Sequence, residues 1–140
     1  MLRDPVAARA WLKEAAQQGF EASILNYATM LADGQGGPRD IPTAVTLYKS
    51  LATKNHPGAL HGLGLLLESG LGAAPDPARA LALQQLAADR YPAAKARAEA
   101  LLEVVSDSDK EKAAAYVKNP VSIFEDSNTA ATKSGEKSPP

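Results

Sequence analysis

The sequence predicts an all-α fold, an α/α right-handed superhelical solenoid of antiparallel helix hairpins. One observation behind this is a set of residue types that recurs every 36 positions, as in repeat architectures. A second is that each repeat holds two stretches with apolar residues at helical spacing, separated by glycine or proline. A third is alanine, with 28 residues of 140, because alanine favours helix and lets helices approach closely.

The repeat is visible as columns of equivalent residues. Asp4, Asp40 and Asp76 lie 36 residues apart. The same spacing relates Gly34 to Gly70, and nine such columns make internal duplication the simplest explanation. The other columns are Ala8–Ala44–Ala80, Trp11–Leu47–Leu83, Ala16–Ala52–Ala88, Tyr27–Leu63, Ala28–Gly64, Leu31–Leu67 and Gly36–Gly72.

The first two elements show the local signals that define each helix. Asp4 is a good N-cap, and Pro5 takes the first helical position, where no N–H is needed. The apolar stripe predicts a helix from residue 5 to about 18, which Gly19 ends. A second helix is predicted over 20–33, ending at the glycine-rich turn 34–38.

The same signals place the remaining elements. Helices are predicted at 41–54, 57–69, 77–89, 92–105 and 107–118, with Pro57 and Pro92 at helix starts. The last helix carries charges on one side and alanines on the other, as expected of a terminal helix with one solvated face. We therefore expect a solenoid over residues 1–118. Residues 119–140 are rich in Ser, Thr, Lys and Pro, which predicts a disordered tail.

These columns resemble the Sel1-like repeats of the tetratricopeptide-repeat (TPR) superfamily. The family unit is similar to Leu-Gly-x-x-Tyr-x-x-Gly-x-Gly followed by Asp, then a helix ending in Ala-Ala-x-x-Gly. The resemblance covers residues 4–105 in about 2.5–3 repeats. It departs from the family where Leu31 and Leu67 replace tyrosine, and where Asn55 and Tyr91 replace glycine. It rests on Leu63-Gly64, Gly70, Gly72 and Asp76 in one unit, and on Ala15-Ala16 and Gly19 in another.

The amino-acid composition excludes several classes of partner and binding site. With 15 basic and 16 acidic residues the chain lacks the basic excess of a nucleic-acid-binding protein. The absence of cysteine excludes disulfides and zinc sites built on thiolates. No run of about 18 apolar residues predicts direct membrane insertion. Asp4, Lys13 and Glu14 interrupt any signal-peptide pattern, so we expect a soluble intracellular protein, in the cytoplasm or mitochondrion.

Local motifs favour structural roles over catalysis. The turn 34–38 lacks the Gly-Lys-Ser/Thr of a phosphate-binding loop. His56 and His61 are five residues apart and lack the spacing of two ligands on one helix face, so we expect a turn residue and a surface residue. The aligned aspartates are expected to cap helices, and Trp11 and Tyr48 to be core residues. We expect no enzyme, metal or cofactor, since no nucleophile motif such as Gly-x-Ser-x-Gly occurs.

The resemblance implies a protein-interaction scaffold that binds a protein or peptide on its concave face. The first helix of each hairpin lines that face in a solenoid. We expect Met30, Leu66 and Leu102 to be exposed there as apolar anchors. The full set of candidate partner-binding residues is Ser23, Asn26, Met30, Gly62, Leu66, Lys95 and Leu102.

Two other functions are open alternatives. In the first, the chain is a structural subunit or assembly factor docked stably in a larger complex, for example a mitochondrial or membrane-associated one. An adaptor should be a stable monomer, whereas such a subunit should be marginally stable alone. The other is a hydrolase activity, sometimes proposed for Sel1-repeat proteins, which would need a nucleophile and a base for which the sequence offers no motif.

Overall fold

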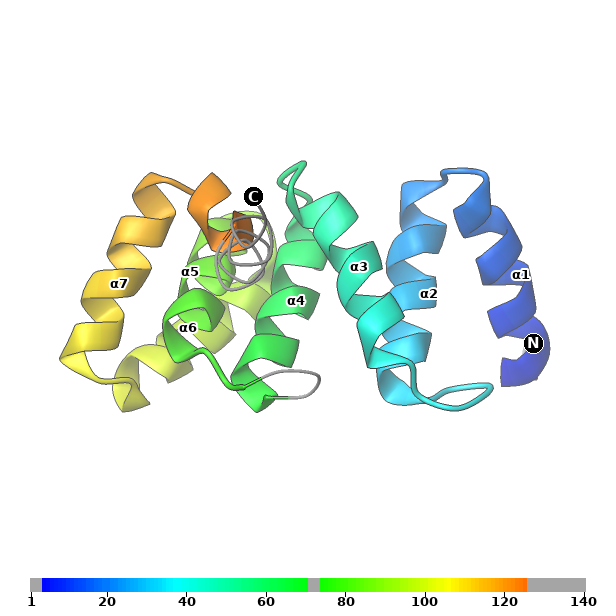
Figure 1. Cartoon of the computed structure of the whole chain (residues 1–140), viewed down its shortest axis with the longest axis horizontal. Coiled ribbons are helices and arrows are strands. Elements are labelled where there is room, and N and C mark those ends of the chain that lie inside the picture. Colours follow the sequence, from blue (N-terminus) through cyan, green and yellow to red (C-terminus); the bar gives the residue numbers. More distant parts are fainter. Residues whose placement is uncertain (1–3, 71–73, 126–140) are drawn as a thin grey trace, which may run out of the picture.

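The structure is a computed structural model that describes residues 4–70 and 74–125 (Figure 1). Seven antiparallel helices follow one another along its long axis, from α1 at one end to α7 at the other, and the described residues contain no strand. The predicted all-α solenoid of helix hairpins is confirmed. The helices are α1 Pro5–Gln17, α2 Glu21–Asp33, α3 Ile41–Ala52, α4 Pro57–Ser69, α5 Pro77–Ala87, α6 Pro92–Val104 and α7 Asp107–Lys118.

The repeated aspartates begin the helices as expected. The Asp4 side chain accepts hydrogen bonds from the N–H groups of Val6 and Ala7. Asp40 accepts from the N–H of Thr43, and Asp76 from that of Arg79. In each case proline occupies one of the first two helical positions, so the capped turn has one fewer N–H to satisfy.

The repeated glycines end the first helix of each hairpin. Gly34 and Gly70 adopt φ of 76° and 77°, a left-handed conformation that glycine takes without steric cost. After each turn a backbone hydrogen bond connects the chain to the helix that it has just left. The Asp40 N–H donates to the Leu31 carbonyl and the Asp76 N–H to the Leu67 carbonyl, both at 2.9 Å. The described ends of the α2–α3 and α4–α5 connections are therefore held in the same way.

The glycine-rich turn 34–38 lies against the first helix of the chain. Arg9 on α1 donates hydrogen bonds to the carbonyls of Gln35 and Pro38, at 3.1 and 2.8 Å. At Gly36 a Cβ atom would come within 2.3 Å of the Pro5 carbonyl oxygen, so only glycine allows this approach. The turn joins the two helices of one hairpin, α2 and α3, in agreement with the interpretation as an inter-helix turn.

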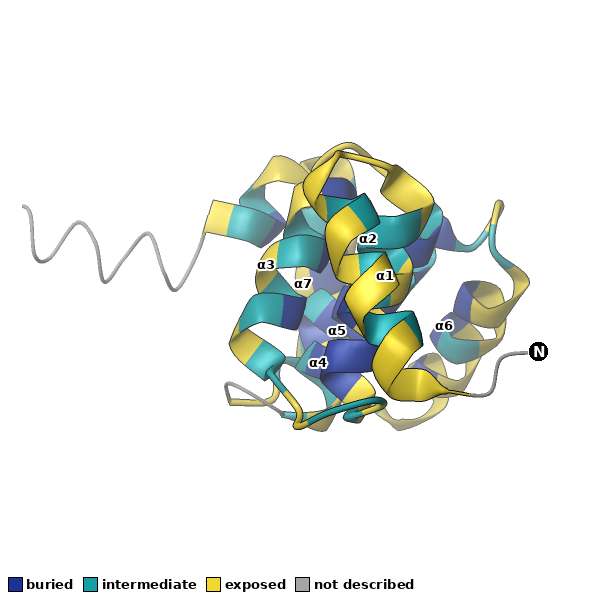
Figure 2. Ribbon diagram, turned by 90° about the vertical axis from the view of Figure 1, so that its right-hand side faces the viewer, coloured by how far each residue is buried: buried dark blue, intermediate teal, exposed yellow. Residues whose placement is uncertain are grey.

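The core lies between α3, α4 and α5, where alanine and leucine dominate. Leu81, Leu83 and Leu60 are among the fully buried side chains. Tyr48 is buried, as predicted. Trp11, by contrast, is 73% exposed, and the prediction that it is a core residue is wrong. The reason is its position on α1, which packs chiefly against α2 and has no buried residue (Figure 2).

The C-terminal unit departs from the repeat. Only Val105 and Ser106 separate α6 from α7, where the other hairpins have a seven-residue loop. This short link sends α7 onto α5 rather than alongside α6. Residues 121–125 then form a further helical turn that buries Ile123, and Arg79 on α5 donates to the Ile123 carbonyl at 2.9 Å. The predicted tail at 119–140 therefore begins too early, and residues 126–140 lie outside the described residues.

Candidate functional site

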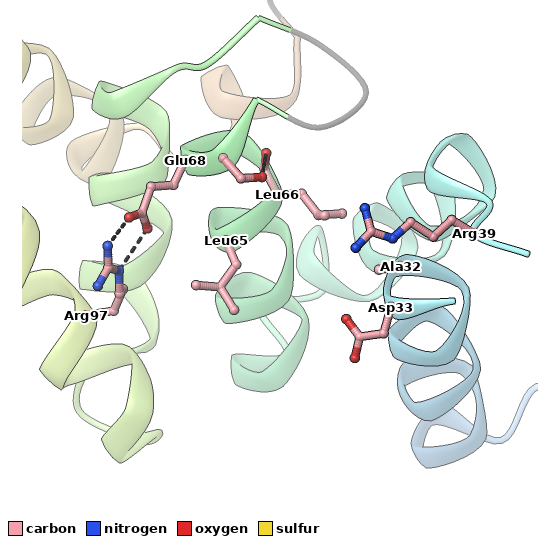
Figure 3. Close-up of a pocket in the computed structure, with 8 residues that line it drawn as sticks. Ala32, Asp33, Arg39, Leu65, Leu66, Glu68 and Arg97 are labelled. Atoms are coloured by element: carbon pink, nitrogen blue, oxygen red, sulfur yellow. Dashed lines mark hydrogen bonds and ion pairs between the residues drawn. The ribbon is translucent and has the colours of Figure 1, made fainter. Parts of the chain in front are cut away.

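Two adjoining hollows follow the face formed by α2, α4 and α6, and together they form what we call the groove. The charged pocket has a volume of about 430 Å³ and includes Arg39, Glu68 and Arg97 (Figure 3). The aromatic pocket, between α2 and α4, has about 420 Å³ and includes Tyr48, His61 and Tyr91. Both pockets share Ala32, Asp33, Leu65 and Leu66. The groove thus runs along the first helices of the hairpins.

Glycines on α4 make room for the walls of the aromatic pocket. A Cβ atom at Gly62 would lie 2.6 Å from the Tyr48 ring, and one at Gly58 would lie 2.8 Å from the Leu25 side chain. Contacts this short do not occur, so any larger residue at either position would displace its neighbour. The small residues of α4 therefore let Tyr48, which comes from α3, reach the groove.

His61 is held by a glutamine from the neighbouring helix. Gln84 on α5 is fully buried, and its Nε2 donates to the His61 carbonyl at 3.1 Å. Its Oε1 therefore faces His61 Nδ1, at 2.8 Å. Gly64 permits this arrangement, since a Cβ there would come within 2.6 Å of Gln84 Nε2. The His61 ring also stacks at a tilt on Tyr91, with ring centroids 5.1 Å apart.

Tyr48 is fixed by a hydrogen bond across α2 and α3. Its hydroxyl lies 2.9 Å from Thr29 Oγ1. Burial raises the pKa of the Tyr48 hydroxyl above its usual value, and the hydrogen bond with Thr29 offsets part of that rise. The ring is therefore a rigid, neutral wall of the pocket.

The charged pocket contains one ion pair and two further charged residues that take no part in that pair. Arg97 on α6 pairs with both carboxylate oxygens of Glu68 on α4, with Nε to Oε1 at 2.9 Å (Figure 3). This hydrogen bonding raises the pKa of the Arg97 guanidinium. Asp33 and Arg39 are exposed, and neither forms an ion pair with the described residues. Both are available to an incoming partner.

The structure brings together some of the residues expected to bind a partner. Asn26, Gly62 and Leu66 all line the aromatic pocket. However, Leu66 is buried, as is Met30, so the expectation that they are exposed anchors is wrong. Met30 lines neither pocket, whereas Leu66 lines both but has only 7% of its surface exposed.

The other expected residues lie off the groove. Leu102 is 38% exposed but lines neither pocket, and neither does half-buried Ser23. Lys95 lines a separate hollow of about 640 Å³ beside Tyr91 and Pro92. That any of the seven predicted residues binds a partner stays a prediction.

Sequence reasoning missed the main groups of the groove. His61 was expected on an open helix surface, yet it is half-buried and hydrogen-bonded. His56, expected in a turn, is the N-cap of α4 and accepts weakly from the Ala59 N–H. A signal was present in the three small residues Gly58, Gly62 and Gly64, which weaken a helix unless large neighbours need the space. Leu65, Asp33 and Arg39 carried no comparable signal.

Neither a metal cluster nor a membrane span is found in the part of the chain that the structure describes. Those residues contain no group of three or more His, Asp or Glu side chains placed to hold a metal ion. Among them, too, no helix combines the length and the apolar character that crossing a membrane requires.

Comparison with known proteins identifies the repeat. The Sel1 repeat model matches residues 1–20, 22–56 and 57–91. A Sel1 repeat protein from Oxalobacter formigenes is 30% identical over 68% of this chain, with a TM-score of 0.60. A protective antigen of uropathogenic Escherichia coli strains, which displays an SLR fold, is 20% identical over 99% of the chain, with a TM-score of 0.75. The chain spans 39% and 30% of the lengths of these two proteins. No curated protein matches it.

Proposed function

Because the chain belongs to the Sel1 repeat family, a non-catalytic repeat scaffold whose members generally serve in protein–protein interaction, we propose that it binds an extended segment of a protein partner in the groove. The segment lies across α2 and α4, beside the Glu68–Arg97 pair that joins α4 to α6.

The observation that carries this proposal is the combination of groups along the groove. Leu65 is 41% exposed and lines both pockets, so it offers apolar area to a bound chain. Asn26 is exposed beside it, and its side-chain amide can both donate to and accept from a peptide backbone. An apolar floor with a few polar groups that fix orientation is the usual composition of a peptide-binding groove.

A random-peptide selection tests the proposal and does not require that the natural partner be identified. A display library of twelve-residue peptides is selected on the immobilised chain, and the enriched peptides are titrated into the isotope-labelled protein by NMR. We expect the largest chemical-shift changes at Asn26, His61 and Leu65. The Leu65→Asp variant should weaken binding at least tenfold, because it places a charge on the apolar floor.

Leu102→Asp is the matched control, since Leu102 is almost as exposed as Leu65, at 38% against 41%, but lines neither pocket. It should leave peptide binding unchanged. If enriched peptides shift residues outside the groove, or bind the Leu65→Asp and wild-type proteins equally, the groove is not the binding site and the proposal fails.

A second function, stable docking as a subunit of a larger complex, is favoured by one observation. Val6, Trp11 and Phe20 expose apolar side chains at the α1 end of the solenoid. Scattered exposed apolar residues are common, but three at one end of the solenoid favour docking through that end. Analytical ultracentrifugation of the isolated chain separates the two functions. A docking subunit should self-associate through this end, and Trp11→Ser should abolish the association, whereas an adaptor should remain monomeric.

A further inference from the structure

Two hydroxyl groups of the aromatic pocket, those of Thr29 and Tyr48, use their protons within the protein. Thr29 Oγ1 donates its proton to the Leu25 carbonyl at 3.0 Å. In the 2.9 Å hydrogen bond between Thr29 and Tyr48, the tyrosine must then be the donor, because a hydroxyl has only one proton. Both hydroxyl protons are thus used within the protein, and what remains on these oxygens is capacity to accept.

The same holds for His61. Since Gln84 presents its carbonyl oxygen to His61 Nδ1, that nitrogen carries the ring proton in the neutral imidazole. The other ring nitrogen, Nε2, is then an acceptor. This nitrogen forms no hydrogen bond with the described residues and is not fully buried, so a ligand can reach it.

Asp33 gives the aromatic pocket a negative charge. It is the only Asp, Glu, Lys or Arg among the described residues that line the pocket. Its carboxylate is exposed and forms no ion pair with the described residues. Asp33 is also the last residue of α2, where the helix dipole adds partial negative charge. Arg39, the exposed cation of the groove, lines the charged pocket and not this one.

We propose that the aromatic pocket binds a lysine side chain of the partner segment, an inference that rests on the function proposed above. The lysine ammonium pairs with the Asp33 carboxylate, while its methylene stem packs between Leu65 and the rings of Tyr48 and Tyr91. A cation beside aromatic rings is attracted to their faces, and the open Nε2 of His61 can accept a hydrogen bond from the partner segment.

Lysine fits these acceptors better than other side chains. Asp33, Tyr48 and His61 come from three different helices, and a tetrahedral ammonium with three donors can address acceptors in several directions. Arginine presents its donors in one plane, which suits the Asp33 carboxylate but does not also suit acceptors on two other helices. An aliphatic side chain would leave the Asp33 carboxylate partly desolvated without a partner, which is unfavourable.

Two matched peptide libraries test the inference. Both consist of random twelve-residue peptides with acetylated N-termini and amidated C-termini, so that neither end contributes a charge. They differ only at one fixed central residue, which is lysine in one library and norleucine, an uncharged residue of similar shape, in the other. Peptides that bind wild-type protein but not Leu65→Asp are kept as groove binders. We expect groove binders from the lysine library, and replacement of that lysine by norleucine should weaken each about tenfold to a hundredfold.

Asp33→Asn supplies the second half of a double-mutant cycle. It should weaken binding of the lysine peptides by a similar factor, and the norleucine peptides should bind wild type and Asp33→Asn equally. Glu103→Gln is the control, because Glu103 is exposed on α6 and lines neither pocket. Thermal denaturation of each variant shows that its fold is intact.

The outcomes separate the two proposals. Groove binders that tolerate norleucine, or that bind Asp33→Asn as tightly as wild type, overturn the lysine inference and leave the groove proposal standing. Binding that requires a free peptide N-terminus, tested with non-acetylated peptides, also overturns it, because the ammonium would then come from the chain end. If neither library yields a peptide sensitive to Leu65→Asp, the proposed function itself fails.

Discussion

Helices α1 and α5 occupy the same place in the repeat but differ in burial. Trp11 on α1 is 73% exposed, whereas Leu83, its equivalent on α5, is fully buried. No residue of α1 is buried, whereas seven of the eleven residues of α5 are. The difference comes from neighbours, since α5 packs against α4, α6 and α7, while α1 packs chiefly against α2 (Figure 2). A repeat column specifies which face of a helix is apolar, and the adjoining helices determine whether that face is buried.

The largest expected effect tests this comparison directly. Leu83→Ala should lower the free energy of unfolding by about 2–5 kcal/mol, because it leaves a cavity in the core. Trp11→Ala should change it by less than about 0.5 kcal/mol, as for most exposed residues. Denaturant titration followed by circular dichroism measures both without depending on the only tryptophan. Equal losses in the two variants would show that α1 is packed as tightly as α5.

The second-largest expected effect concerns another column of the 36-residue repeat, formed by Leu12, Tyr48 and Gln84. In this column α5 carries the fully buried polar residue Gln84. Gly64→Ala should cost about 1–3 kcal/mol, because the new methyl group displaces the Gln84 amide from its hydrogen bonds with His61. In Gln84→Ala the space is free, so the double variant should lose at least ~1 kcal/mol less than the sum of the single changes. Additive losses would mean that the Gly64–Gln84 contact is relieved by other movements.

A smaller effect is expected at Tyr48 in the same column of α3. Tyr48→Phe should cost about 0.5–1.5 kcal/mol, since it removes the hydrogen bond with Thr29 and keeps the ring. Burial raises the pKa of Tyr48, so its contribution to stability is present below the ordinary tyrosine value of about 10 and is lost as pH rises above it. The loss of melting temperature between pH 9 and 11 should therefore be shallower in Tyr48→Phe than in wild type.

The smallest effect concerns the capping column, in which Asp40 has a bond that Asp4 lacks. Thr43 Oγ1 donates to the Asp40 carboxylate at 2.7 Å, and this hydrogen bond, with that of the Thr43 N–H, lowers the pKa of Asp40. Its stabilising contribution is present above the ordinary pKa of about 3.8 and is lost as pH falls below it. Thr43→Val should flatten the fall in melting temperature between pH 5 and 2.5. If the melting temperature of Thr43→Val falls as steeply as that of wild type over this pH range, the assignment is wrong.

Much of the fold could be predicted because its signals are local. Capping aspartates, prolines at helix starts and glycines at helix ends each act within a few residues, so the seven helices lie within about two residues of their expected bounds. The candidate site was harder to predict. Asn26, Gly62 and Leu66 do line the aromatic pocket, but Met30 and Leu66 are buried rather than exposed. A small error in the rotation of a helix is enough to move a side chain from the groove into the core.

By itself, the sequence determined the 36-residue unit, its two helices and its turns, because these depend on hydrogen bonds and backbone conformations close along the chain. Only the tertiary structure decided where α7 packs, that Ile123 is buried, and which side chains meet in the groove. His61 and Gln84 are 23 residues apart, and Asp33, Tyr48 and Tyr91 come from three separate parts of the chain. Their proximity depends on how the hairpins stack, and the sequence of a single repeat does not determine that stacking.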